Sequence, residues 1–199
     1  MDPQDSTMLP TQETPPEEPR DAAHWAALTS ALKVTNIPVG AVSLNVDGRR
    51  VVGPLQGFGQ LWQKTYRVRL NSVQVTPTVV IKTWKEQFPT FWPRGNRFYE
   101  PLTGIAPGEV ALLSLKVAGG MRLSTGVLVL YADDESFTLM TPQGHVLAGW
   151  ITFSAEVRAA QYAASRGSSG AVSRAGVVVE SCGSIACFSS RFPSQAGFL

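Results

Sequence analysis

Three side chains in the central part of the chain could move protons: Tyr99, Glu109 and His145. A general acid or base must exchange a proton near the working pH within hydrogen-bond reach of the substrate, and histidine does so most readily. His145 follows Pro-Gln-Gly in a turn sequence, where a solvated turn residue is the simpler interpretation. Glu109 follows a Gly-rich turn, where a surface carboxylate is the simpler interpretation. The three residues are the candidates for catalysis, each with a structural alternative.

A second set of residues could bind an apolar molecule. Large flat side chains gather between residues 84 and 99, and two more aromatic residues stand in predicted strands. Such side chains bind apolar rings with little loss of entropy, but at helical spacing they also serve as core. The predicted ligand-binding residues are Tyr66, Trp84, Phe88, Trp92, Phe98, Tyr99 and Trp150.

Sites for metals, nucleotides and covalent catalysis are not predicted. The two histidines lie far apart and the two cysteines, Cys182 and Cys187, stand near the end of the chain, so no zinc ligand set forms. The glycines of residues 53–59 lack the spacing and the following helix of a phosphate-binding loop. No serine stands in a nucleophile-elbow sequence. We therefore expect no metal and no cofactor.

The composition favours a globular chain. Of the 199 residues 44% are hydrophobic and 16% are charged. The formal net charge of +2 is too small to indicate a basic patch over a whole face. Nucleic-acid binding is therefore not expected. No apolar run reaches the length of a membrane span, and the first thirty residues lack the pattern of a signal peptide. These features predict a cytoplasmic protein and do not indicate an oligomeric state.

The composition divides the chain into four segments. Residues 1–20 hold five prolines and five acidic residues and are expected to be disordered. Residues 21–35 carry apolar side chains at helical spacing and predict a short helix. Residues 36–157 predict one α+β domain. Residues 158–199 are rich in Ala, Ser, Gly and Arg and are expected to form an unstructured tail.

Within the domain, alternation and turn residues predict the elements. A hairpin is expected over residues 41–55 around Asp47-Gly48, then a half-buried strand over 61–70. A helix is expected over 77–88, because Thr76 suits the N-cap and a proline follows it. Four strands joined by short turns follow over residues 109–157. The strand around residues 123–131 is apolar on both faces, so other elements must cover both.

The order of these elements resembles that of the START-like (SRPBCC, polyketide-cyclase-like) superfamily. The residues that carry the resemblance are Thr76–Pro93, TPTVVIKTWKEQFPTFWP, and Phe98–Leu115, FYEPLTGIAPGEVALLSL. They combine a helix, an aromatic and proline-rich exit, a Gly-rich turn and a strand. The resemblance covers about half of the chain, residues 61–156.

The resemblance implies a helix-grip fold, in which a curved antiparallel sheet with a short helix pair encloses a long C-terminal helix. An apolar small molecule would lie between the sheet and that helix. This sequence departs from the pattern after Val157, where the Ala/Ser/Gly/Arg tail stands in place of an amphipathic helix. We therefore expect the C-terminal grip helix to be missing or degraded.

Three hypotheses of function follow. The first is binding of an apolar small molecule, such as a lipid, a polyketide or an aromatic compound, by the predicted aromatic residues. The second is a cyclase- or dehydratase-type enzyme, in which the same pocket orients a reactive chain and Tyr99, Glu109 or His145 moves protons. The third is a truncated or frameshifted product without function.

Overall fold

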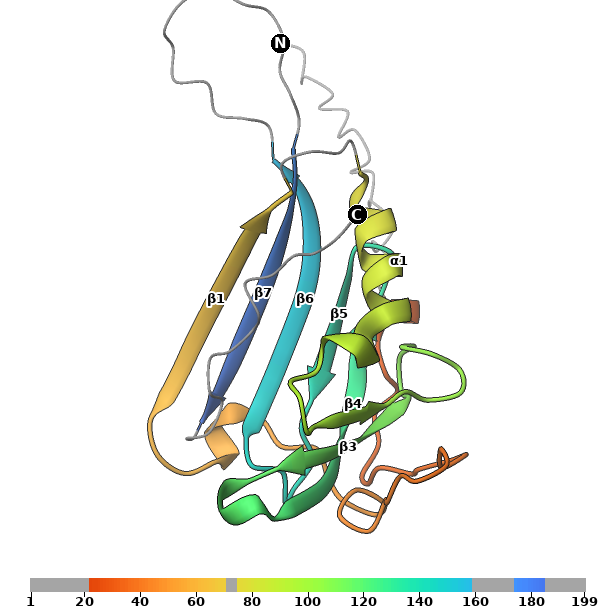
Figure 1. Ribbon diagram of the computed structural model, residues 1–199, viewed down its shortest axis with the longest axis vertical. Helices are drawn as coiled ribbons and strands as arrows, with labels where there is room; N and C mark the ends of the chain where they lie inside the picture. The colour runs from red at the N-terminus through yellow and green to blue at the C-terminus, as the bar shows by residue number, and fades with distance from the viewer. Residues whose placement is uncertain (1–21, 71–74, 159–173, 185–199) are drawn as a thin grey trace, which may run out of the picture.

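The chain forms one antiparallel sheet with a short helix packed on one face (Figure 1). The computed structural model describes residues 22–70, 75–158 and 174–184. The strands follow the order β1-β7-β6-β5-β4-β3-β2 across the sheet. The elements are β1 (Leu61–Arg69), α1 (Pro77–Gln87), β2 (Arg97–Tyr99), β3 (Val110–Lys116), β4 (Arg122–Ala132), β5 (Ser136–Met140), β6 (Ala148–Arg158) and β7 (Arg174–Ser184). The predicted α+β class, with an antiparallel sheet and a short helix, is confirmed.

The four-stranded meander forms where turn residues predicted it. Strands β3, β4, β5 and β6 pair in sequence, and a register shift between Val129 and Tyr131 marks a bulge in β4. Turns close these hairpins because the intervening residues include Gly, Pro and Asp, which suit tight backbone bends. The expected strand at 61–70 is also present as β1.

Helix α1 begins as its sequence predicts. The Thr76 hydroxyl accepts a hydrogen bond from the Val79 N–H at 3.3 Å, and Pro77 occupies the first turn, where its missing N–H costs nothing. Pro89 then prevents the α-helix from continuing, and the chain passes into a 3-10 helix, Phe88–Phe91. The Lys85 ammonium donates a hydrogen bond to the Asp133 carbonyl at 2.6 Å, which ties α1 to the turn between β4 and β5.

The expectation of an unstructured tail after residue 157 is wrong for strand β7. Residues Arg174–Ser184 enter the sheet between β1 and β6, and pair with β6 along their whole length and with β1 from Gly176 to Ser184 (Figure 1). An unpaired β1 and an unpaired edge of β6 provide two complementary rows of backbone donors and acceptors, which outweigh a sequence without clear alternation. The meander strand β6 is therefore not the last strand of the domain. Residues 159–173, 185–199 and the acidic segment 1–20 lie outside the described residues.

The N-terminal region of the domain departs from both predictions made for it. The short helix expected over 21–35 is reduced to a 3-10 turn, Ala22–His24, because the Ala26 N–H donates to the Leu130 carbonyl of β4 at 2.8 Å. The expected hairpin over 41–55 does not form. Its Asp47-Gly48 turn is present, but the flanking backbone bonds elsewhere: the Leu32 N–H donates to Arg49 and the Val52 N–H to Thr141.

The two faces of the sheet are covered by different parts of the chain. On one face, Ile81 and Phe88 pack on Val127 and Val129 of β4. On the opposite face, the irregular N-terminal segment covers β4, and its buried residues are Leu32 and Val46, packed with Leu112 and Leu128. The prediction that both faces of this strand are covered is therefore confirmed, although the second cover is neither a helix nor a hairpin.

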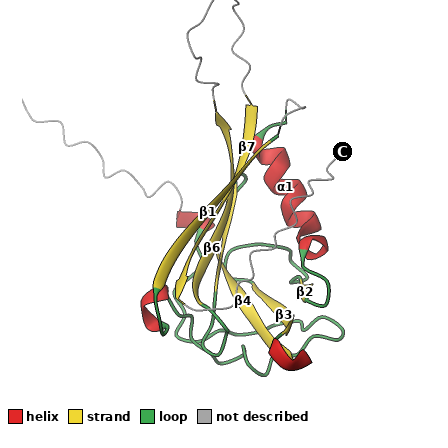
Figure 2. Cartoon of the chain, turned by 60° about the vertical axis from the view of Figure 1, so that its left-hand side comes forward, coloured by secondary structure: helices red, strands yellow, loops and turns green. Residues whose placement is uncertain are grey.

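Strand β1 lies at the edge of the sheet, two strands away from β6, the strand on which α1 packs. Its side chains Tyr66 and Val68 are 38% and 51% exposed, so the expected half-buried character is not observed. Figure 2 shows β1, β7 and β6 twisting across one another, with α1 to one side of them. Among the helices that the structure describes, none is long and apolar enough to cross a membrane.

Candidate ligand-binding face

The register of the sheet aligns several aromatic residues in one row. Phe137 of β5 lies opposite Phe153 of β6, Phe153 lies opposite Val179 of β7, and Val179 lies opposite Tyr66 of β1. Directly paired residues of antiparallel strands project to the same face. Phe137, Phe153 and Tyr66 therefore share the face on which α1 packs, and we call it the helix face.

Over β5 and β6 the helix face is closed by an aromatic cluster. Phe88 meets Phe98, Phe137 and Phe153 edge to face, with ring centroids 4.9, 5.4 and 5.1 Å apart, and Phe137 stacks on Phe153 at 4.7 Å. All four side chains are at most 6% exposed. These geometries are the favourable ones for aromatic pairs. The predicted ligand-binding residues Phe88 and Phe98 thus fill the space between helix and sheet themselves.

Trp84 and Trp92 lie at the margins of the aromatic cluster. Trp84 meets Phe153 edge to face at 5.1 Å, and Trp92 stacks on Phe98 at 5.5 Å. Both indoles are half-buried, so each presents part of a flat apolar surface outside the packed core. Through Phe153, Trp84 contacts β6, the strand of the aromatic cluster that lies next to β7.

Tyr66 continues the aromatic row onto the open part of the sheet. It shares the register row of Phe137 and Phe153 but remains 38% exposed, and Val68, two residues along β1, is 51% exposed. On the same face of β1, the Lys64 ammonium lies 5.0 Å from the centre of the Trp62 ring, a cation–π contact. The helix face therefore passes from a closed core under α1 to an exposed surface on β1.

The structure separates Trp150 from the other predicted ligand-binding residues. Trp150 alternates along β6 with Ile151 and Phe153, which pack in the core under α1, so its indole projects from the opposite face. It is 39% exposed there. Tyr99 also leaves the set, because it alternates with Phe98, and its hydroxyl donates a hydrogen bond to the Gly40 carbonyl at 3.0 Å.

The three candidates for catalysis do not come together. Glu109 stands immediately before β3, whereas His145 stands in the turn after β5, which runs parallel to β3 two strands away. Along the strand direction, the two side chains therefore lie at opposite ends of the sheet. Tyr99 uses its hydroxyl to hold the N-terminal segment on β2.

His145 is not the solvated turn residue that its sequence context suggested. It is half-buried, and its Nδ1 accepts a hydrogen bond from the Leu147 N–H at 3.0 Å. Desolvation by burial lowers the pKa of His145 to about 4. The imidazole is therefore neutral near pH 7, and its nitrogen is occupied in closing the turn.

Sequence reasoning missed Phe137 and Phe153, which form the centre of the aromatic cluster. Both stand at inward positions of strands whose alternation is visible in the sequence, Ser136–Met140 and Ala148–Arg158. The aromatic residues of the helix and its exit stand close together in the sequence, whereas Phe137 and Phe153 stand apart, in strands that the helix covers.

Within the described ranges, no three His, Cys, Asp or Glu side chains come together as a set that could hold a metal ion. Comparison with known proteins adds no family to this description. No protein-family model, no curated protein and no solved structure matches the chain.

Proposed function

We propose that the protein binds an apolar small molecule with a flat ring system, such as an aromatic compound or a polyketide, on the helix face between Trp84 and Tyr66. The observation that carries the proposal is the row of aromatic residues that begins buried at Phe137 and Phe153 and ends exposed at Tyr66. A ring laid beside Phe153 would extend this row and would cover apolar surface that is in contact with water.

The half-buried Trp84 supports the same position. Its indole already meets Phe153 edge to face at 5.1 Å, so it can form the wall of a site whose floor is β6, β7 and β1. Val68, exposed on the same face of β1, adds an aliphatic surface to that floor. The site would then combine an indole wall, inclined by 68° to the Phe153 ring, with the surface of the sheet, an arrangement suited to a planar ligand.

The resemblance to START-like proteins supports the proposal in one further respect. It implies that a ligand lies between the sheet and a C-terminal segment. We propose a helix-grip-like arrangement in which the ligand lies on the part of the helix face that α1 leaves exposed.

A neutral fluorescent probe tests the proposal. N-phenyl-1-naphthylamine is titrated into the full chain, and emission excited through tryptophan reports binding. Saturable binding is expected. The Tyr66→Ser and Trp84→Leu variants should each raise the Kd roughly threefold to tenfold, since one aromatic contact contributes about 0.5–1.5 kcal/mol.

Trp150→Leu is the matched control. It removes an exposed indole of β6 from the opposite face, so its Kd should equal that of the wild type. Thermal unfolding of each variant verifies that it is folded, and Tyr66→Ser, at an exposed edge position, keeps the test valid if Trp84→Leu is unstable. Absence of saturable binding to the wild type, or an equal loss in Trp150→Leu, would overturn the proposal.

A further inference from the structure

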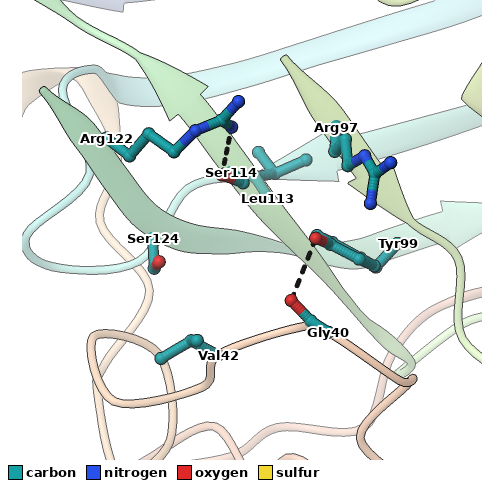
Figure 3. A pocket seen from close by; sticks show the side chains of 8 residues that line it. All are labelled: Gly40, Val42, Arg97, Tyr99, Leu113, Ser114, Arg122 and Ser124. Atoms are coloured by element: carbon teal, nitrogen blue, oxygen red, sulfur yellow. Dashed lines mark hydrogen bonds between the residues drawn. The ribbon is translucent and has the colours of Figure 1, made fainter. Parts of the chain in front are cut away.

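A hollow of about 370 Å³ lies on the face of the sheet opposite α1 (Figure 3). Its floor is formed by β2, β3 and β4, and its wall by the loop that contains Gly40 and Val42. The hydrogen bond from Tyr99 to the Gly40 carbonyl holds that loop against β2. The Asn45 amide donates to the Ser124 carbonyl at 3.0 Å and holds the same segment against β4. The hollow is therefore fixed at both sides by polar contacts.

The register places a row of polar side chains across the floor of the hollow. Arg97 of β2 lies opposite Ser114 of β3, and Ser114 lies opposite Ser124 of β4. Arg122 stands two residues before Ser124 and therefore projects to the same face. Its Nη1 donates a hydrogen bond to the Ser114 hydroxyl at 3.0 Å, which directs the guanidinium toward the middle of the row (Figure 3). Two guanidinium groups thus flank one serine from the two neighbouring strands.

Among the described residues, no ion pair compensates the positive charge around this row. Lys116 lies directly opposite Arg122 in the register, and both are exposed. Like charges directly opposite each other in a sheet are destabilising. Among the side chains that line the hollow there is no carboxylate. Across the described ranges, none of Arg97, Lys116 and Arg122 forms an ion pair. An anion bound between them would remove this repulsion.

We propose that the hollow binds the phosphate group of a small organic phosphate monoester. Arg97 and Arg122 each present a planar fork of N–H donors that matches two oxygens of a phosphate, and the Ser114 and Ser124 hydroxyls supply further donors. Val42 lines the same hollow and provides an apolar surface for the organic part of the ester. The volume is in the lower part of the roughly 300–1,000 Å³ range of small-molecule sites. This site is independent of the helix face.

Titration calorimetry with phenyl phosphate, in a buffer of low ionic strength without phosphate, tests the assignment. Saturable binding to the full chain is expected, with a Kd at least tenfold higher for Arg97→Gln and for Arg122→Gln, because hydrogen bonds to charged groups are strong. Arg67→Gln is the matched control. It removes an exposed arginine from β1, at the other end of the sheet, and should leave the Kd unchanged.

Two further ligands test the contributions of the phosphate group and of the organic group separately. Inorganic phosphate should bind more weakly than phenyl phosphate, and benzamide, a neutral ring, should not compete. Equal affinities for inorganic phosphate and phenyl phosphate would overturn the assignment of an organic ester. Absence of phenyl phosphate binding, or an equal loss of affinity in Arg67→Gln, would overturn the site. Because the two sites lie on opposite faces of the sheet, a failure of the neutral naphthylamine probe to bind the helix face would leave these phosphate-binding tests unchanged.

Discussion

Thr125 is the position where the packing of the sheet makes the sharpest prediction about stability. Its side chain is 0% exposed, and its Oγ1 has no hydrogen-bond partner among the described residues. The residue stands in β4 opposite Leu113, a buried member of the core under α1. A buried hydroxyl without a partner costs about 1–3 kcal/mol of stability. Valine has the same shape and a high strand preference, so it can replace threonine without a cavity.

Thr125→Val should therefore raise the free energy of unfolding by about 1–2 kcal/mol. For a chain of this size each kcal/mol corresponds to roughly 2–4 °C in Tm. Urea unfolding followed by tryptophan fluorescence measures the free energy, and calorimetry measures the Tm. The slope of the urea transition should not change, because the surface exposed on unfolding is the same.

Thr138→Val is the matched control for this substitution. Thr138 is also a buried threonine of the sheet, but its Oγ1 forms a hydrogen bond with the Thr152 hydroxyl at 2.9 Å. Removing that bond should lower stability by about 0.5–1.5 kcal/mol. The opposite signs of the two changes are the test. A Thr125→Val variant that is less stable than the wild type would show that its hydroxyl has a partner in solution, and would refute the reasoning.

Three other substitutions or deletions probe separate features. Because the pKa of His145 is lowered to about 4, the unfolded chain binds a proton at this histidine before the folded chain does as the pH falls. The free energy of unfolding should therefore drop between about pH 6.5 and 4, by as much as about 3 kcal/mol. His145→Gln should flatten this part of a stability–pH profile, and an unchanged profile would contradict the desolvation of the imidazole. Gly126→Ala should destabilise by about 1–3 kcal/mol in urea unfolding, since its Cβ would lie 2.5 Å from the Ala111 carbonyl of β3 and 3.1 Å from Val46 of the N-terminal segment. A neutral effect would contradict the close approach of β3 and the N-terminal segment at this position. Ending the chain before Arg174 removes β7, which pairs with both β1 and β6, and should abolish the cooperative unfolding transition in urea. A truncated chain that unfolds as the full chain does would refute the position of β7.

The elements that form from local interactions could be predicted from the sequence. Thr76 and Pro77 mark the start of α1 because an N-cap and a first-turn proline act on the residues beside them. The meander follows from alternation and turn residues, which are also local signals. In the candidate site, the same signals identified Trp84, Phe88 and Trp92 as members of one aromatic group, which the structure brings together.

The tertiary structure decided the features that depend on partners distant in the sequence. Strand β7 forms because β1 and β6 offer it two rows of backbone hydrogen-bonding groups, and residues 174–184 carry no sustained alternation that would predict this pairing. Pairing with the sheet likewise replaced the predicted N-terminal helix and hairpin. The face on which an aromatic side chain lies is set by register, which placed Tyr66 on the same face as the aromatic cluster and Trp150 on the opposite face. Arg97 and Arg122 meet over Ser114 for the same reason, because three strands align residues that the sequence separates.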